Sequence, residues 1–306
     1  MKLATIKDRD TERVWVDTSF GFVPMESINR QCNQTWPLEM LKLIQSGKLE
    51  ELNGWYRSGG QEELGTLKDQ AIMYDQVEFA PLYRKPRKIW GIGLNYQEHA
   101  SDLSEKAPTI EPASFMKPDT TIIGHGDYIE IPLQSKSTTA EGELGVIIGR
   151  KCKDVERKDW LSVVAGFTTI LDMTAEDILR KNPRYLTMSK SFDTFFSFGS
   201  LLLTPDEIED VMGLNVATVI NGQVHARNVV ANMTFPPDLL VSFHSRIMTM
   251  LPGDVISTGT PGAVPISEGD KVECWIDGFQ PLVNPVKDLK NTAKPRIIDQ
   301  NRRRKT

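Results

Sequence analysis

The chain has 306 residues, and its 36 Lys or Arg against 41 Asp or Glu give a formal net charge of −5. This balance argues against a broad basic surface for nucleic acid. Hydrophobic residues at 40% and charged residues at 25% are typical of a globular protein. A chain of this length can bury a core large enough to fold without disulfides or a structural metal.

The three cysteines, Cys32, Cys152 and Cys274, are far apart and form no C-x-x-C pair. That spacing excludes a disulfide framework or a zinc knuckle and is typical of a reducing compartment. No apolar run approaches the roughly 18 residues that a membrane span requires. Charged residues occupy the first positions, where a signal peptide needs an apolar segment. We therefore expect a soluble, cytoplasmic protein with neither a nucleic-acid partner nor a membrane partner.

Residues 1–80 are predicted to form a small N-terminal α/β unit. Its apolar patterns predict strands at 3–6 and 14–16, a helix at 35–47 and a second short amphipathic helix around 64–72. Thr35 can serve as the N-cap of the first helix, and Gly47 is expected to end it. Residues 81–88 follow as a basic, proline-marked connector.

The segment 86–287 is predicted to be a second, larger domain that is rich in short strands. Strands are expected at 129–132, 144–148, 167–171, 200–204, 215–220, 254–258 and 271–276, and helices at 159–165, 174–181 and 237–250. Gly-Asp and Asn-Gly turns introduce several of these strands. The pattern predicts a β-rich α+β fold and not an alternating βαβ fold. Residues 288–306 are expected to form a polar, basic, solvated tail.

Two glutamates, Glu141 and Glu143, flank Gly142 and precede the apolar run 144–148. In a strand, residues two apart point to the same face, so both carboxylates would project together. Two bare carboxylates side by side repel each other, and a divalent cation removes that repulsion. Oxygen ligands of this kind suit Mg²⁺, Mn²⁺ or Ca²⁺ and not zinc. The alternative is that both charges lie on the solvated face of a half-buried strand.

A third acid, Asp172, ends the apolar run 167–171 and precedes T-A-E-D at 174–177, a pattern that predicts a helix N-cap. The point where a strand ends and a helix starts is a common place for a metal-bound acid. Asp172 is therefore predicted to join the two glutamates. Alternatively, it is simply a second acid that caps the helix.

A candidate general base, His99, lies in a polar segment with Asp102 three residues further along. If that segment is helical, Asp102 lies beside His99, orients its imidazole and raises its basicity. The alternative for His99 is an exposed loop histidine.

Two further features suit the binding of negative charge. Lys190, which follows a mixed apolar and polar stretch, can hold a substrate oxyanion near a metal, or it is an ordinary surface lysine. The run Thr258-Gly259-Thr260 follows a predicted strand, and its backbone N–H groups can bind a carboxylate. The alternative for this run is a plain tight turn.

Together these segments resemble the fumarylacetoacetate hydrolase family. The matching segments follow the family's order and are G-L-N-Y-Q-E-H at 93–99, F-M-K-P at 115–118, E-G-E-L at 141–144, D-M-T-A-E-D at 172–177, K-S-F-D at 190–193, N-G at 221–222 and L-P-G-D-V-I-S-T-G-T-P at 251–261. The resemblance covers about residues 86–287. The N-terminal unit resembles the small extra domain that many bacterial-type members carry.

The resemblance implies a mixed β-roll or β-sandwich catalytic domain that usually forms a homodimer. It also implies Mg²⁺ or Mn²⁺ held by Glu141, Glu143 and Asp172. The implied substrates are small 2-oxo or diketo acids, which family members hydrolyse, decarboxylate, isomerise or hydrate. The residues implied to contact substrate are Lys117, Glu176, Arg180, Thr258, Gly259 and Thr260, with His99, Asp102 and Lys190 as catalytic residues.

The chain departs from the family pattern at two places. Glu176 stands where the family usually has Arg, and this reversal of charge is expected to change which substrate carboxylates are tolerated. Arg180, one helical turn on, either pairs with Glu176 or partly replaces the missing cation. Asp102 stands where one branch of the family usually has Glu, which leaves Glu98 as a fallback partner for His99.

The sequence therefore predicts a metal-dependent hydrolase that cleaves a C–C bond in a β-diketo acid or an acylpyruvate-type 2-oxo acid. A decarboxylase, isomerase or hydratase acting on a related acid is the alternative on the same scaffold. A metal-binding relative without catalytic activity is a further alternative, in which Glu176 marks the loss of activity.

Overall fold

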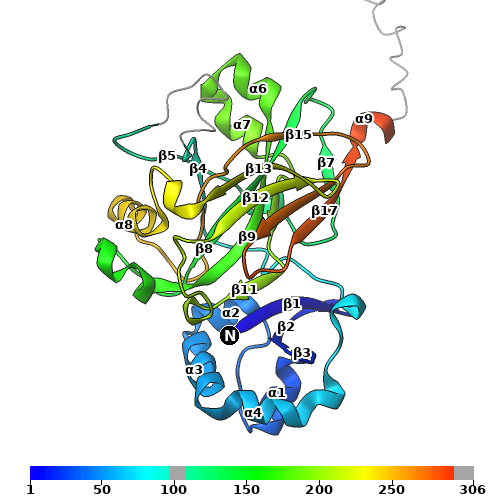
Figure 1. Cartoon of the computed structure of the whole chain (residues 1–306), viewed down its shortest axis with the longest axis vertical. Helices are drawn as coiled ribbons and strands as arrows, with labels where there is room; N and C mark the ends of the chain where they lie inside the picture. Colours follow the sequence, from blue (N-terminus) through cyan, green and yellow to red (C-terminus); the bar gives the residue numbers. More distant parts are fainter. Residues whose placement is uncertain (97–107, 293–306) are drawn as a thin grey trace, which may run out of the picture.

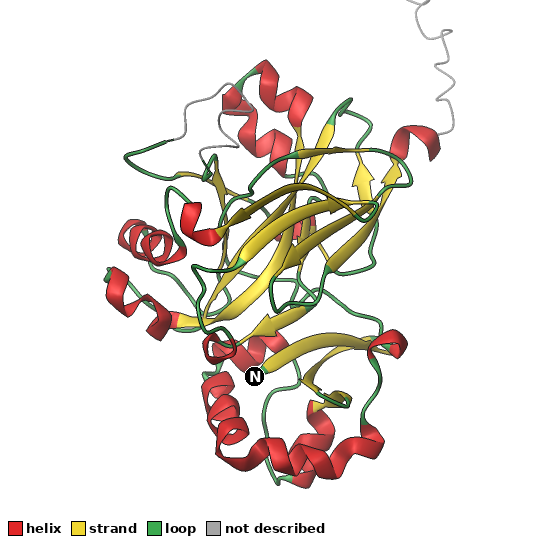
Figure 2. Ribbon diagram, viewed as in Figure 1, coloured by secondary structure: helices red, strands yellow, loops and turns green. Residues whose placement is uncertain are grey.

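The computed structural model describes residues 1–96 and 108–292. Strands fill the middle of the molecule and helices lie around them, as Figures 1 and 2 show. The strands form a 12-stranded sheet and a 5-stranded sheet, each with parallel and antiparallel neighbours. The predicted β-rich α+β class is confirmed.

The larger sheet is built around two long antiparallel strands, β8 (Thr138–Ile148) and β9 (Val164–Ala175). Every residue of both strands is buried. The others in the sheet are β1 (Lys2–Asp8), β2 (Thr11–Thr18), β3 (Gly21–Pro24), β4 (Ile89–Gly93), β5 (Ala113–Met116), β6 (Ile122–Ile123), β10 (Phe196–Phe198), β11 (Leu201–Leu203), β14 (Val255–Ser257) and β15 (Val264–Ile266). The path through the sheet runs β3-β2-β1-β11-β9-β8-β14-β4-β5.

The smaller sheet runs in the order β13-β12-β16-β17-β7. Its strands are β13 (Gln223–Val229), β12 (Asn215–Ile220), β16 (Lys271–Ile276), β17 (Leu282–Asp288) and β7 (Ile129–Ile131). It packs on β8 at Gly142, whose N–H donates to Thr218 Oγ1 at 2.8 Å. A Cβ at Gly142 would lie 2.8 Å from the carbonyl oxygen of Ala217. The glycine between the two glutamates thus allows the backbones of the two sheets to approach closely.

Helices are short and mostly peripheral (Figure 2). The α-helices are α1 (Met25–Gln31), α2 (Met40–Gln45), α3 (Lys48–Trp55), α4 (Gln61–Leu64), α6 (Glu176–Lys181), α7 (Leu186–Lys190), α8 (Pro237–Ile247) and α9 (Leu289–Thr292). Short helices of other types are η1 (Tyr56–Gly60), η2 (Gly65–Gln70), η3 (Tyr74–Gln76), η4 (Asp119–Thr121), η5 (Arg157–Val163), η6 (Pro183–Tyr185), η7 (Pro205–Glu207) and η8 (Val230–Asn232).

Three sequence predictions about these elements need correction. The helix predicted from Thr35 begins only at Met40, and it ends before Gly47, which has a φ of +72°. The helix predicted at 159–165 is the 3₁₀ turn η5, and its last two residues belong to β9. Short apolar runs do not separate helix from strand, and at 164–165 pairing within the sheet decides.

The third correction concerns Asp172, which was predicted to end a strand. It lies inside β9, which continues to Ala175. Ala175 is the N-cap of α6, without a side-chain capping bond. The hydroxyl of Thr174 donates to Glu141 Oε1 at 2.7 Å and does not cap the helix. Thr174 is still paired with β8, and its hydroxyl therefore bonds to a side chain of that strand and not to the start of the helix.

The N-terminal elements β1–β3 and α1–α4 form the lower part of the molecule in Figure 1. They continue the larger sheet, since β1 pairs antiparallel with β11. They also share one buried apolar cluster with the rest of the chain, in which Leu3 and Leu43 join Ile147 and Phe196. This shared core fixes the N-terminal elements to the main sheet.

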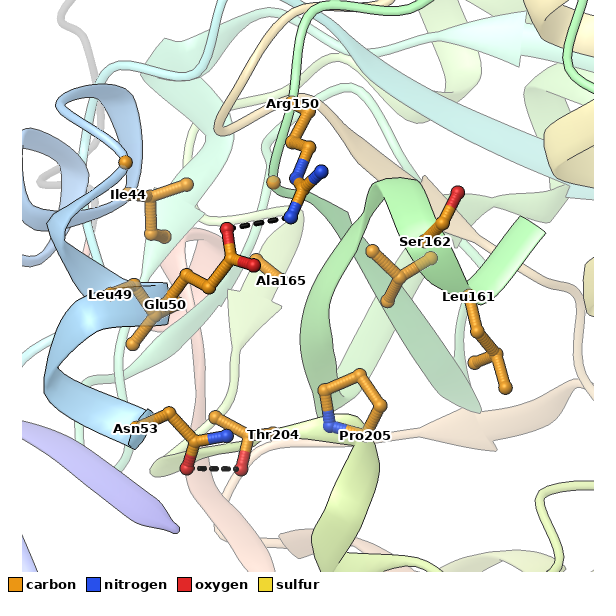
Figure 3. Close-up of a pocket in the computed structure, with 13 residues that line it drawn as sticks. Ile44, Leu49, Glu50, Asn53, Arg150, Leu161, Ser162, Ala165, Thr204 and Pro205 are labelled. Carbon is orange, nitrogen blue, oxygen red and sulfur yellow. Dashed lines mark hydrogen bonds and ion pairs between the residues drawn. The ribbon is translucent and has the colours of Figure 1, made fainter. Parts of the chain in front are cut away.

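A cleft of about 310 Å³ lies along this junction (Figure 3). An ion pair between Glu50 and Arg150 crosses it, with 2.6 Å between Oε2 and Nη2. The residues that line this cleft do not include Glu141, Glu143 or Asp172. Within the described part of the chain, no helix is both long and apolar enough to span a membrane.

Candidate metal centre

Three buried carboxylates come together at the middle of the β8–β9 pair. Glu141 lies directly opposite Asp172 in the strand register, and Glu143 lies two residues along β8 on the same face. The ligand oxygens of all three lie within 4.8 Å of one another. The exposed fractions are 8% for Glu141, 1% for Glu143 and 0% for Asp172, so these charges are not on a solvated face.

Two buried lysines reach this cluster from other elements. Lys190, the last residue of α7, places Nζ 2.8 Å from Glu141 Oε2 and 2.7 Å from Asp172 Oδ2. Lys117, just after β5, places Nζ 2.5 Å from Asp172 Oδ1. The Nζ of Lys190 also lies 4.9 Å from the centre of the Phe115 ring. When all five groups are ionised, three carboxylates against two ammonium groups leave one uncompensated negative charge.

The pKa values of the two buried lysines shift in opposite directions, although burial acts to lower both. It lowers the pKa of Lys117, because desolvation outweighs the attraction of Asp172. It also works to lower the pKa of Lys190, but the charges of Asp172, Glu141 and Glu143 outweigh it and raise the pKa. Lys190 is therefore the more firmly charged member of the pair.

The carboxylate of Glu143 is held by the start of the 258–260 turn. Its Oε2 accepts a hydrogen bond from Ser257 Oγ at 2.5 Å and one from the Gly259 N–H at 2.9 Å. Burial, followed by the negative charges of Asp172 and Glu141, raises the pKa of Glu143 to about 8. A carboxylate in this position is stabilised by a cation bound beside it.

The two threonine hydroxyls of that turn have partners within the chain. The Thr258 hydroxyl donates to the Leu144 carbonyl oxygen at 2.9 Å, and the Thr260 hydroxyl donates to the Gly262 carbonyl oxygen at 3.0 Å. The N–H of Gly259 was expected to bind a substrate carboxylate, and in the structure it binds that of Glu143. Substrate contact by this turn stays a prediction.

Glu176, which is predicted to influence specificity, forms an ion pair within its own helix. Glu176 Oε1 lies 2.8 Å from Arg180 Nε, one helical turn apart on α6. Of the two outcomes considered for Arg180, pairing with Glu176 is the one present. The Glu176 side chain is 12% exposed whereas that of Arg180 is 65% exposed. His99 and Asp102, the predicted base and its partner, lie outside the described residues, as does Glu98.

The sequence patterns missed two residues that orient the acids. Thr174 was interpreted as a helix cap, although its position two residues after Asp172 in a strand places it on the same face. Ser257 ends β14 next to β8, and only the pairing of those strands brings its hydroxyl to Glu143.

The donor set fits a hard divalent cation. All three acids offer oxygen atoms, which Mg²⁺ and Mn²⁺ prefer, and no described cysteine or histidine side chain belongs to the cluster. With the three acids and the two lysines all ionised, a divalent ion would change the net charge of the cluster from −1 to +1. Such a site suits an anionic substrate.

Known proteins resemble both the sequence and the fold. The family model described as "Fumarylacetoacetate (FAA) hydrolase C-terminal" matches residues 88–287. An uncharacterised protein of Methanocaldococcus jannaschii is 41% identical over 207 residues, which cover 67% of this chain and 84% of that protein. The human mitochondrial oxaloacetate tautomerase FAHD2A is 34% identical over 220 residues, covering 69% of this chain and 70% of that one.

Two solved structures cover 94% of this chain and 99% of their own. One is maleylpyruvate hydrolase from Sphingobium sp. SYK-6 in complex with manganese(II) and pyruvate, with 26% identity and a TM-score of 0.76. The other is 5-carboxymethyl-2-hydroxymuconate delta-isomerase from Mycobacterium smegmatis, with 28% identity and a TM-score of 0.72. With a family match that spans about two thirds of its length, this chain belongs to the fumarylacetoacetate hydrolase family.

Proposed function

We propose that this protein is a metal-dependent hydrolase that cleaves the C–C bond of an acylpyruvate-type 2-oxo acid or a related β-diketo acid. The observation that carries the proposal is the buried cluster of three carboxylates and two lysines. The similar maleylpyruvate hydrolase structure, which holds manganese(II) and pyruvate, supports it because that similarity spans the N-terminal unit as well.

Glu141, Glu143 and Asp172 would hold one Mg²⁺ or Mn²⁺. When bound there, the ion supplies a Lewis acid toward the oxygens of the 2-oxo acid. Glu143 is kept in place by Ser257 and Gly259, and Glu141 by Thr174, so the acids are oriented before anything binds.

The chain's own groups would carry out the proton transfers. His99, oriented by Asp102, takes a proton from water, and the hydroxide attacks the carbonyl carbon farther from the carboxylate. The C–C bond breaks, its electron pair leaves with the 2-oxo acid fragment, and a proton returns to that fragment. Lys190 holds negative charge that develops on the substrate. The products are one carboxylic acid and one 2-oxo acid for each water consumed.

A second candidate function is tautomerisation or another isomerisation of a 2-oxo acid. It is favoured by the 34% identity to a protein named as an oxaloacetate tautomerase. The two reactions differ in their products, because only the hydrolase consumes water and splits the carbon chain.

The test is turnover of acylpyruvates, oxaloacetate and hydroxymuconate-type acids by the chelator-treated protein with and without Mn²⁺. We expect metal-dependent formation of two fragments from an acylpyruvate. Glu141→Ala and Asp172→Ala should each weaken Mn²⁺ binding by at least about tenfold in calorimetry, since a ligand and its charge are lost. Equal Mn²⁺ affinity in both variants would refute the metal centre. An intact, tautomerised product would replace the hydrolase by the isomerase.

His99→Ala tests the base separately. It should cut hydrolysis by roughly 10² or more while Mn²⁺ affinity stays that of the wild type. Unchanged turnover would remove His99 from the mechanism.

We further propose a cytoplasmic homodimer, for which sedimentation should give twice the chain mass of 34.4 kDa.

A further inference from the structure

Asn95 is a buried asparagine that ties three segments together. It follows β4 and lies after Leu94, a non-glycine residue with a φ of +55°, a backbone conformation that costs energy and redirects the chain. Asn95 is 1% exposed. Its Nδ2 donates to the carbonyl oxygens of Thr258 at 2.7 Å and Phe235 at 3.0 Å. Its Oδ1 accepts from the Phe235 N–H at 2.9 Å.

The bond to Thr258 reaches the candidate metal centre through a single peptide group. The carbonyl of Thr258 and the N–H of Gly259 belong to the same planar unit, in which the two groups point in opposite directions. Asn95 holds the carbonyl end of this unit, and Glu143 Oε2 accepts the hydrogen bond from its N–H end at 2.9 Å. Fixing one end of the plane therefore fixes the direction of the other.

Sheet topology explains why these groups meet. Strands β4 and β14 are parallel neighbours, with Gly91 opposite Ser257, so the residues just beyond their ends lie side by side. Gly259 has a φ of +97°, and a Cβ there would lie 2.7 Å from the Cβ of Asn95. Both the positive φ and the lack of space for a Cβ therefore require a glycine at position 259.

We infer that Asn95 is a positioning residue for Glu143, acting through the Thr258–Gly259 peptide group to hold that carboxylate in its metal-binding orientation. This inference rests on the proposed metal centre. Asn95 contacts none of the three acids itself, so its effect is on how well Glu143 is oriented. Outer-shell groups of this kind typically change metal affinity by about 10- to 100-fold.

The experiment compares Mn²⁺ affinity by calorimetry, and thermal stability, in the wild type and in two variants at position 95. Asn95→Ala removes all three side-chain hydrogen bonds. Asn95→Asp keeps the shape and the acceptor for the Phe235 N–H but replaces the amide group that donates to the carbonyl oxygens of Thr258 and Phe235. An added negative charge alone would strengthen cation binding, so weaker binding in Asn95→Asp reports lost orientation. We expect both variants to bind Mn²⁺ at least about tenfold more weakly.

Asn284→Ala is the matched control. Asn284 is also fully buried, and it also makes three hydrogen bonds, donating to Gly124 and Asp127 and accepting from Ser197. It should lower the unfolding temperature as Asn95→Ala does, with unchanged Mn²⁺ affinity.

The possible outcomes separate the two proposals. Wild-type Mn²⁺ affinity in Asn95→Asp, or a loss in Asn284→Ala as large as that in Asn95→Ala, would overturn the role of Asn95 and leave the metal centre standing. If Asn95→Ala does not fold, Asn95→Asp decides alone. Absence of Mn²⁺ binding in the wild type would instead overturn the proposed centre, and the role of Asn95 with it.

Discussion

At the scale of single residues, the candidate centre is a balance of buried charges. The ammonium group of Lys190 contacts carboxylate oxygens of both Glu141 and Asp172, and a bound cation would need the same oxygens as ligands. Under the proposed function the same ammonium group would also hold negative charge on the substrate. In the proposed reaction its charge opposes metal binding and favours substrate binding, and a single substitution can separate the two effects.

Lys190→Met keeps the length of the side chain and removes its charge. We expect Mn²⁺ to bind about tenfold more tightly, because one repulsive charge is gone. We expect kcat to fall by about 10², because the developing negative charge loses its partner. Lys42→Met is the control, since Lys42 forms an exposed ion pair with Glu39, 2.6 Å between Nζ and Oε1. A parallel loss of metal affinity and kcat in Lys190→Met would contradict this account.

The pair Glu176–Arg180 makes a prediction about specificity. Replacing Glu176 with Arg reverses a largely buried charge, and the ratio of kcat/KM for oxaloacetate over a neutral-tailed acylpyruvate should rise by about tenfold. Arg180→Ala is a variant of opposite sign, because it leaves Glu176 unpaired, and it should lower the same ratio. If neither variant changes the ratio, residue 176 does not face the substrate.

At the scale of elements, the strand β8 contributes to the candidate metal centre on one face and to the contact between the two sheets on the other. One face carries Glu141 and Glu143, and the other face packs at Gly142 against the backbone of β12. The side-chain period of a strand makes both possible within three residues. The small residue between the acids is therefore required by the contact between sheets.

Gly142→Ala tests this contact. The new methyl group would lie 2.8 Å from the Ala217 carbonyl oxygen, so the strands must separate. We expect a loss of about 1–3 kcal/mol of unfolding free energy in urea titrations, together with weaker Mn²⁺ binding. Gly54→Ala in α3 is the control, because no heavy atom lies within 4 Å of its new methyl group. It should leave stability unchanged or raise it by up to about 1 kcal/mol. Equal effects of both changes would count against the packing argument.

At the scale of the whole molecule, the N-terminal elements and the main sheet share one apolar core. Leu3 of β1 is fully buried in that cluster, whereas the Glu50–Arg150 pair beside it is exposed, at 72% and 57%. Burial of apolar surface therefore contributes more to the junction than this ion pair does.

Calorimetry of two variants can measure this difference. Leu3→Ala should lower the unfolding free energy by about 2–5 kcal/mol and shift a single cooperative transition of the entire chain. Arg150→Ala should cost less than about 1 kcal/mol, since both partners are solvated. Two separate transitions, of which Leu3→Ala moves only the smaller, would show that the N-terminal elements unfold independently.

The features of this protein that depend on local spacing can be predicted from its sequence. The i, i+2 separation of Glu141 and Glu143 requires a shared face once the segment is a strand. The predicted strand cores at 144–148 and 167–171 lie within β8 and β9, because apolar β-branched runs are locally readable. The specific order of short motifs also identified the family.

The groups that contact the three acids, in contrast, are set by the arrangement of strands in three dimensions. Lys117 reaches Asp172 across 55 positions of sequence, and Ser257 reaches Glu143 across 114. Such contacts depend on strand order and register, which no local pattern encodes. For the same reason Thr174 looked like a helix cap, although pairing of β9 with β8 directs its hydroxyl to Glu141. The three acids can be predicted from their positions in the sequence, whereas their hydrogen-bond partners depend on how distant strands fold into one sheet.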